Sequence, residues 1–303
     1  MNESSLIEKV KKILDSKIIG DDTAPMKIGN KTLLFTNDIL LEGQHFLDHF
    51  PTVHLGWKAV SVNVSDIVAS GGQPKYLLVS LLLPKNKTDL VDSIYRGIAK
   101  ACRYYGCQVI GGNMTASDKL GIDIFMVGEA KKFVARRGAH PKDNLYLSGP
   151  VGDSKAGLEL LLMKRTVYEP FEKKLIERHL RPVVDLKLKN LIGRYATAAI
   201  DLSDGLSSDA GHLSKNSRVK LVLNAKQIPI SDELKQFCIK YRHDPVGFAV
   251  GGGEDYRILF TTKNRLPKTA AGLYLIGSLK QGSGLYLDKI KLANKSFDHF
   301  SSS

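Results

Sequence analysis

Aspartates beside short apolar segments are the residues of this sequence whose chemistry is easiest to name. Asp201 ends an apolar run, and Asp204 follows three residues later, just before Gly205, where the backbone can turn. This pattern predicts a strand that runs into the N-terminus of a helix. Carboxylates at such a junction lie near the partial positive charge of the helix start, a place suited to hard cations and phosphate oxygens.

Helix capping explains the same two aspartates without any ligand. Asp and Ser are common N-cap residues, so this stretch alone favours a capped helix over a metal site. Further acids shift that balance, most of them beside turns or at the ends of apolar segments: Asp21, Asp22, Asp38, Asp66, Glu254 and Asp255. Carboxylates brought together repel one another unless cations hold them, and Mg²⁺ with nucleotide phosphates is the usual occupant of an oxygen-only site.

Asp66 lies among apolar neighbours in a segment, residues 55–69, that has the character of a buried helix. A buried carboxylate without a partner is costly, so Asp66 needs a cation, which is either a lysine or a metal ion. The sequence has neither a GxxxxGK[ST] loop nor a kinase-type glycine loop with a following strand lysine. A phosphate ligand would therefore be bound by other means.

Length and composition limit the classes of protein to which this chain can belong. A chain of 303 residues fits two domains of about 150 residues each, and 43% hydrophobic with 25% charged residues is typical of a soluble globular protein. No apolar window approaches the ~20 residues of a membrane span, and the N-terminus does not have the pattern of a signal peptide, so we expect a cytoplasmic protein without membrane partners. Three cysteines without CxxC spacing favour reduced, structural thiols.

The formal charge of +13 raises the question of nucleic acid. Lysines and arginines are spread along the chain without a dense basic run or interleaved aromatic residues, so no nucleic-acid partner is expected. The charge indicates only a general attraction for small anions.

The surrounding pattern alternates strands and helices, which predicts an α/β or α+β layered fold. In the first half we expect helices over 5–16, 55–69 and 88–105, the last capped by Thr88. Strands are expected on both sides of a Gly29–Asn30 turn, the second over 32–38 and ending in Asp38, and then over 75–83, buried on both faces, 108–115, leading into a glycine-pair turn, and 120–130. In the second half the expected elements are strands at 144–149, 219–223, 273–278 and 285–292, helices at 158–163 and 232–241, and one helix or a pair of helices over roughly 171–193.

Several of these segments together resemble the thiamine-monophosphate kinase family. The matching motifs run in order along the chain: Gly20-Asp-Asp22, Thr36-Asn-Asp-Ile-Leu-Leu-Glu-Gly-Gln-His-Phe46, Val62-Asn-Val-Ser-Asp66, Ile110-Gly-Gly-Asn113, Arg136-Arg-Gly-Ala139, Ser148-Gly-Pro-Val-Gly-Asp153, Ile200-Asp-Leu-Ser-Asp-Gly-Leu206, Gly251-Gly-Gly-Glu-Asp-Tyr256 and Phe297-Asp-His-Phe300. The acidic and glycine-rich turns are shared with the wider aminoimidazole ribonucleotide synthetase superfamily. The Glu-Gly-x-His-Phe segment and the Asp-His-Phe segment narrow the resemblance to the thiamine enzymes.

The resemblance implies a two-domain fold like that of aminoimidazole ribonucleotide synthetase. Residues 1–140 would form the ATP- and Mg²⁺-binding domain, which dimerises through its β-sheet, and residues 141–303 a C-terminal α/β domain. The implied activity is ATP-dependent phosphorylation of thiamine monophosphate to thiamine diphosphate by a homodimer, through direct in-line transfer. Because the acceptor is already an ionised phosphate, positioning and cationic charge suffice for catalysis.

Carried over position by position, the resemblance assigns three groups of residues. The Mg²⁺ ligands would be Asp22, Thr36, Asp38, Asp66, Asn113, Asp201 and Asp204, the last two being catalytic. The ATP contacts would be Gly112, Asn113, Arg136, Ser203 and Tyr95. The thiamine site would be lined by His45, Glu254 and Phe297.

Some of these assignments have plainer alternatives: His45 as a core histidine, Arg136 as a solvated charge and Phe297 as a hydrophobic plug. Two asparagines also depart from the family pattern, Asn113 from an aspartate and Asn37 from a threonine or serine. Since an amide adds no negative charge, one metal should bind more weakly. A related ATP-dependent enzyme of the superfamily, or a catalytically weakened regulator that binds ATP or thiamine phosphate, therefore remains an alternative function.

Overall fold

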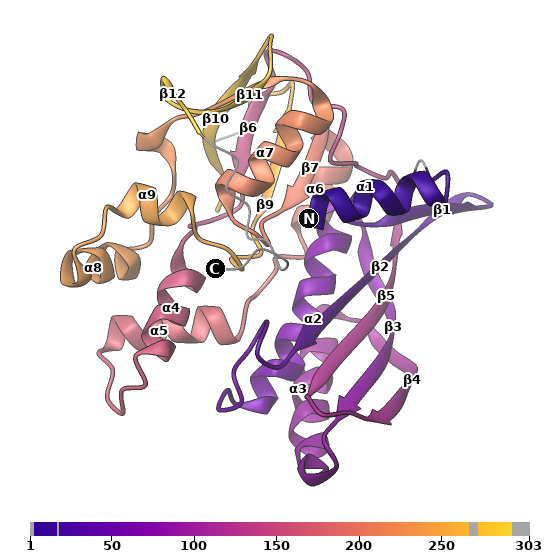
Figure 1. Ribbon diagram of the computed structural model, residues 1–303. Helices are drawn as coiled ribbons and strands as arrows, with labels where there is room; N and C mark the ends of the chain where they lie inside the picture. Colours follow the sequence, from indigo (N-terminus) through magenta and orange to yellow (C-terminus); the bar gives the residue numbers. More distant parts are fainter. Residues whose placement is uncertain (1–2, 17, 267–271, 293–303) are drawn as a thin grey trace.

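The computed structural model describes residues 3–16, 18–266 and 272–292, which form two β-sheets with helices packed against them (Figure 1). The predicted α/β layered fold is thereby confirmed. Among the described residues, no helix combines the length and the apolar character that crossing a membrane requires.

The first sheet contains five strands in the order β1-β2-β5-β3-β4, in which only β3 and β4 are parallel neighbours. Two helices, α2 and α3, belong to the same part of the chain, and the short helix α1 precedes the sheet (Figure 1). The elements span α1 Glu3–Ile13, β1 Ala24–Ile28, β2 Lys31–Leu41, α2 Thr52–Ala69, β3 Gln73–Leu83, α3 Leu90–Tyr105, β4 Gln108–Ala116 and β5 Gly121–Ala130.

The second sheet contains seven strands in the order β12-β11-β8-β10-β6-β9-β7. Helix α7 packs against β7, β8 and β11, while α4, α5 and α8 contact one another beside the sheet (Figure 1). The elements span β6 Asn144–Leu147, α4 Asp153–Leu162, α5 Pro170–Leu180, α6 Leu188–Tyr195, β7 Ala198–Asp201, α7 Leu206–Ser217, β8 Lys220–Leu223, α8 Asp232–Tyr241, α9 Pro245–Val250, β9 Ile258–Thr262, β10 Tyr274–Lys280, β11 Gly284–Leu287 and β12 Ile290–Lys291.

Helix α2 is the element that joins the two halves. It is buried along nearly its whole length, because it contacts β2, β5 and α3 on one side and α6, β7 and β9 on the other. Its crossing with α3 depends on two glycines: a Cβ on Gly56 would lie 2.1 Å from the carbonyl oxygen of Ile94, and one on Gly97 would lie 2.0 Å from that of Val53. The two helix backbones can therefore approach closely enough to fix α2 in place.

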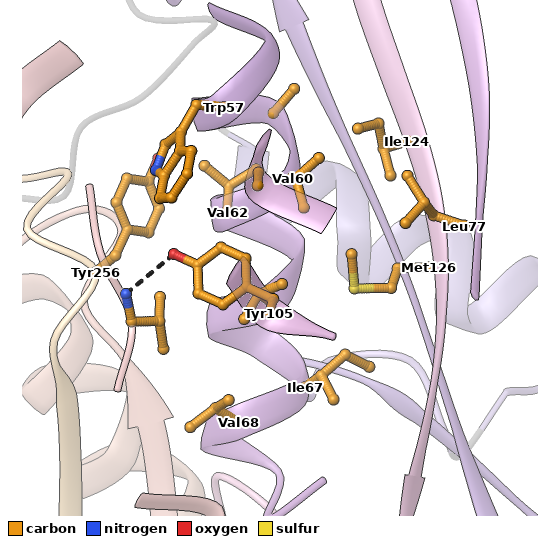
Figure 2. Close-up of a cluster of buried hydrophobic side chains, with 14 of the residues drawn as sticks. Trp57, Val60, Val62, Ile67, Val68, Leu77, Tyr105, Ile124, Met126 and Tyr256 are labelled. Atoms are coloured by element: carbon orange, nitrogen blue, oxygen red, sulfur yellow. Dashed lines mark hydrogen bonds between the residues drawn. The ribbon is translucent and has the colours of Figure 1, made fainter. Parts of the chain in front are cut away.

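Polar contacts complete the core around α2. The indole Nε1 of Trp57 donates to the carbonyl oxygen of Pro182 at 2.7 Å, and the amide of Val184 donates to the Tyr105 hydroxyl at 3.2 Å. Figure 2 shows Trp57, Tyr105 and the apolar side chains of α2 in one cluster with Tyr256 of the second half. Burying these polar groups with partners avoids the desolvation cost of leaving them unpaired.

Four local predictions about the first half are wrong. Strand β3 alternates between buried and exposed positions, so its outer face, including Tyr76, is not covered by this chain. The glycine pair lies inside the edge strand β4 rather than in a turn, and Asp38 lies within β2, which continues to Leu41. Helix α3 has Asp89, not Thr88, at its N-cap, and that side chain makes no capping hydrogen bond.

Candidate active site

A cleft of about 1000 Å³ lies between the two halves, at the edge of β2. Strand β1 pairs with residues 31–35 of β2, so within the part of the chain that the structure describes no strand neighbours the edge of β2 from Thr36 onwards on that side. Residues 36–40 of this free edge line the cleft, together with residues of α2, of the turn after β7 and of the loop that precedes β9.

Three aspartates from three separate elements meet in the cleft. Asp22 precedes β1, Asp66 lies on α2 and Asp201 ends β7, and one carboxylate oxygen from each lies within 4.8 Å of the others. The strand-to-helix junction predicted at Asp201 is observed, and Asp66 lies on the predicted helix, where it is half-buried rather than buried. Among the described residues no ion pair joins a lysine to Asp66, which favours the metal ion as its counter-ion.

Strand β2 and the segment after β5 supply the next contacts. The Thr36 hydroxyl donates to Asp66 Oδ2 at 2.5 Å, and Asp38 also lines the cleft. The Arg136 Nε donates to Asp22 Oδ1 at 2.5 Å, while its backbone amide donates to Asp21 at 2.6 Å. Arg136 is thus not a freely solvated charge, because its guanidinium is part of the acidic site.

The pKa values of these carboxyl groups show how crowded the site is. Burial and, secondarily, the neighbouring carboxylates raise the pKa of Asp201 to about 8. Burial also raises the pKa of Asp22 to about 6 despite the opposing effect of Arg136, and it raises that of Asp66 well above its usual range. A partly buried, oxygen-only set of this kind, with more negative than positive charge, fits a divalent cation such as Mg²⁺.

The turn after β7 corrects the capping interpretation of the opening stretch. The N-cap of α7 is Gly205, which has no side chain, and the carboxylate that accepts from the amides of Asp204 and Gly205 belongs to Asp209, at 3.2 and 3.0 Å. Asp201 and Asp204 are therefore not the N-cap, and both line the cleft with Ser203. Asp209 was absent from the predicted site, although it follows the Ile200–Leu206 motif by only three residues.

The other end of the cleft is apolar and contains one carboxylate. Its walls are formed by Phe46, Leu47, Phe50, Leu158 and Leu162 with Glu254, and Tyr256 lines the cleft between Glu254 and the aspartates. His45 also lines this end, and its Nδ1 accepts the amide of Leu41 at 3.0 Å, so a neutral ring carries its proton on Nε2. The adjacent Glu42 is outside the cleft, where it binds Lys87 and the amide of Leu120 and so fixes the loop that carries His45.

Some functional candidates were missed and others are not in the cleft. Lys155 and His212 line the cleft without having been predicted, and each comes from a helix whose register only the fold reveals. Gly112, Asn113 and Tyr95 do not line the cleft of this chain. Asn113 is exposed on the edge strand β4, and Phe297 lies outside the described residues.

Comparisons with known proteins agree with this geometry. A family model described as AIR synthase related protein, N-terminal domain, matches residues 20–130, the part of the chain that supplies Asp22, Asp38 and Asp66. This match assigns residues 20–130 to the class of AIR synthase-related domains, and the acidic cleft lies where these residues meet the second half of the chain.

Comparisons with individual proteins identify the family within this class. The thiamine-monophosphate kinase of Aquifex aeolicus (strain VF5) is 46% identical over 301 residues, which cover 99% of this chain and 98% of that protein. The solved structure "AaThiL complexed with AMPPCP and TMP" superimposes with a TM-score of 0.97 at 46% identity, over 99% of this chain and 97% of that one. The enzyme from Stenotrophomonas maltophilia K279a gives a TM-score of 0.81 at 27% identity, over 96% and 98%. The chain belongs to the thiamine-monophosphate kinase family, a family of phosphotransferases.

Proposed function

We propose that this protein transfers the terminal phosphoryl group of ATP to the phosphate of thiamine monophosphate, giving thiamine diphosphate and ADP. The observation that carries the proposal is the lining of the cleft: clustered aspartates at one end, and apolar side chains with Glu254 at the other. Phosphate groups with their cations suit the first end, and an organic ring system that carries a positive charge suits the second. The relative that binds AMPPCP, a methylene analogue of ATP, and TMP has the same fold.

Mg²⁺ held by Asp22, Asp66 and Asp201, with Asp38 and Asp204 beside them, would neutralise the charge on the phosphoryl oxygens. Thr36 orients Asp66 through its hydrogen bond, and Arg136 with Ser203 lies where it can contact the phosphates of ATP. An oxygen of the acceptor phosphate attacks the terminal phosphorus as the bond to ADP breaks. No general base is needed, because the attacking oxygen is already ionised near neutral pH.

His45 and Glu254 would contact the thiamine portion of the acceptor, as would Phe297 by family analogy. His45 offers a ring Nε2, and Glu254 offers a carboxylate that complements a cationic ring. The apolar walls formed by Phe46 and Phe50 would exclude water from this end of the cleft, which strengthens electrostatic contacts.

We further propose a homodimer, formed through the outer face of the first sheet. The stacked rings of Phe35 and Phe125 and the side chains of Ile39, Tyr76 and Leu78, which are 39–48% exposed, lie on this face. Asn113 pairs with Ser80 in register and so lies on the same face. A second copy packed here would cover the apolar residues and bring Gly112, Asn113 and Tyr95 of one chain towards the cleft of the other, where they would contact ATP.

The division into residues 1–140 and 141–303 and a cytoplasmic location are parts of the same proposal. The division is supported by the two sheets, which lie on either side of residue 140. The location is supported by substrates, ATP and a phosphorylated vitamin, that are found in the cytoplasm.

The direct test is to incubate the purified protein with ATP, Mg²⁺ and thiamine monophosphate and to separate the thiamine phosphates by chromatography. We expect thiamine diphosphate in amounts equal to the ADP formed, and no product when unphosphorylated thiamine replaces the monophosphate. Binding of both substrates without any product would instead support the regulator, which the two asparagines would suit.

A further inference from the structure

Glu254 is held in the cleft by two buried residues that no motif of the sequence indicated. Lys58 of α2 places its Nζ 2.8 Å from Glu254 Oε1, and His179 of α5 places its Nδ1 3.5 Å from Glu254 Oε2. The Lys58 and His179 side chains are only 3% and 1% exposed, whereas that of Glu254 is 27% exposed, towards the cleft. The three residues thus link α2, α5 and the loop before β9 at one point.

The cluster combines an ion pair, Lys58 with Glu254, and a neutral histidine, His179. Burial and the positive charge of Lys58 lower the pKa of His179 to about 3, so its imidazole is neutral. Burial acts to raise the pKa of Glu254, but Lys58 outweighs it, and the pKa lies below its usual range. The cluster therefore contains one cation and one anion, and the anion depends on Lys58 for its charge.

The backbone and a second hydrogen bond fix the geometry. Glu254 has a left-handed backbone conformation with φ of +60°, and its amide donates to the carbonyl oxygen of Ser203 at 2.7 Å. His179 Nδ1 also lies 2.9 Å from the Ser154 hydroxyl, which sets the orientation of the ring. The Phe50 ring packs edge-on against His179 at 5.8 Å between centroids, so the cluster is enclosed on the side of the apolar wall.

One helix connects this cluster with the acidic end of the cleft. Lys58, Val62 and Asp66 follow one another at intervals of four residues on α2, so they lie on one stripe of the helix. The eight residues from Lys58 to Asp66 correspond to an axial rise of about 12 Å. Because α2 is buried along its length, the spacing between the two ends of the cleft is fixed by a rigid element.

We propose that Lys58 and His179 are positioning residues that hold Glu254 in place, and in its ionised form, to bind the cationic organic part of the phosphate acceptor. Neither residue lines the cleft, and both act through Glu254. The inference rests on the proposed function for the identity of the acceptor. It predicts that loss of Lys58 weakens acceptor binding selectively, since ATP and its cations occupy the other end of α2.

The test is Lys58→Met in the full-length protein, with separate titrations of thiamine monophosphate and ATP in the steady state. We expect KM for thiamine monophosphate to rise at least tenfold and KM for ATP to change less than twofold. Calorimetric binding of thiamine monophosphate alone should weaken by a similar factor. His179→Leu should act in the same direction with a smaller effect. The matched control is Lys174→Met, since Lys174 pairs with Glu233 on the surface, where its side chain is 62% exposed, and should leave both constants unchanged.

A second variant keeps the test decisive if Lys58→Met fails to fold because the partly buried Glu254 has lost its cation. The double variant Lys58→Met with Glu254→Gln removes both charges and should regain thermal stability without regaining affinity for thiamine monophosphate. A folded double variant with wild-type affinity would overturn the proposal, as would equal losses for both substrates in Lys58→Met. Calorimetry on the wild-type protein distinguishes a failure of this proposal from a failure of the proposed function. A wild-type protein that binds thiamine monophosphate without phosphorylating it contradicts only the proposed function.

Discussion

Replacing Asp201 with asparagine should stabilise the protein in the absence of metal while abolishing its activity. The Asp201 carboxyl group is buried beside other carboxylates, and its pKa is raised from 3.8 to about 8. A group whose folded-state pKa is raised in this way favours folding at low pH and loses that contribution as the pH rises from about 4 to about 8. At 1.36 kcal/mol per pH unit, the cost at pH 7 is at most about 4 kcal/mol, and about 2 kcal/mol if the neighbouring acids share it.

Asparagine has nearly the same shape and no proton to lose, so Asp201→Asn removes this cost. The assay is thermal unfolding at pH 5 and pH 7, with EDTA and with Mg²⁺. Without metal, the variant should be more stable than the wild type at pH 7, with a smaller difference at pH 5. Mg²⁺ should raise the melting temperature of the wild type and have much less effect on the variant. A variant that is less stable than the wild type at pH 7 in EDTA would refute the view that these carboxylates repel one another.

Three further substitutions test other parts of the site. Asp204→Asn should abolish phosphoryl transfer and leave the melting temperature within a few degrees of the wild type, since Asp209 and not Asp204 accepts the amides at the start of α7; near-normal turnover would exclude Asp204 from catalysis. Gly112→Ala should destabilise the protein by about 1–3 kcal/mol in urea unfolding, because the new Cβ would lie 2.0 Å from the carbonyl oxygen of Val79, and an unchanged midpoint would contradict this packing argument. Asn113→Asp should lower the Mg²⁺ concentration for half-maximal activity several-fold by adding a negative charge, and an unchanged Mg²⁺ dependence would remove Asn113 from the set of metal ligands.

Local sequence patterns predicted a helix or strand well where the interactions that define it lie within the same short segment. The helix expected at 232–241 is α8, which begins after Ser231, whose hydroxyl accepts the amide of Leu234 as an N-cap. Strand β3 shows the limit of this reasoning. An apolar strand has the same composition whether its own chain or another molecule covers its second face, so the exposure of Tyr76 and Leu78 could not be foreseen.

The acidic end of the cleft could be anticipated from the sequence because its carboxylates are conspicuous in apolar surroundings. Asp22, Asp66 and Asp201 meet in the structure as their shared pattern indicated. The support for Glu254 could not be anticipated, since Lys58 and His179 come from distant parts of the chain and look like ordinary helix residues. Only the crossing of α2 and α5 beside the loop before β9 brings the three side chains together.

The measurement that tests the proposed reaction most directly is a rapid-quench experiment with ATP labelled in its terminal phosphate, together with Mg²⁺ and thiamine monophosphate. The label should appear in the terminal phosphate of thiamine diphosphate in the first turnover, without labelled protein at any time and with no transfer by Asp201→Asn. Release of the label only as inorganic phosphate, with thiamine monophosphate unchanged, would contradict direct transfer between the two ends of this cleft.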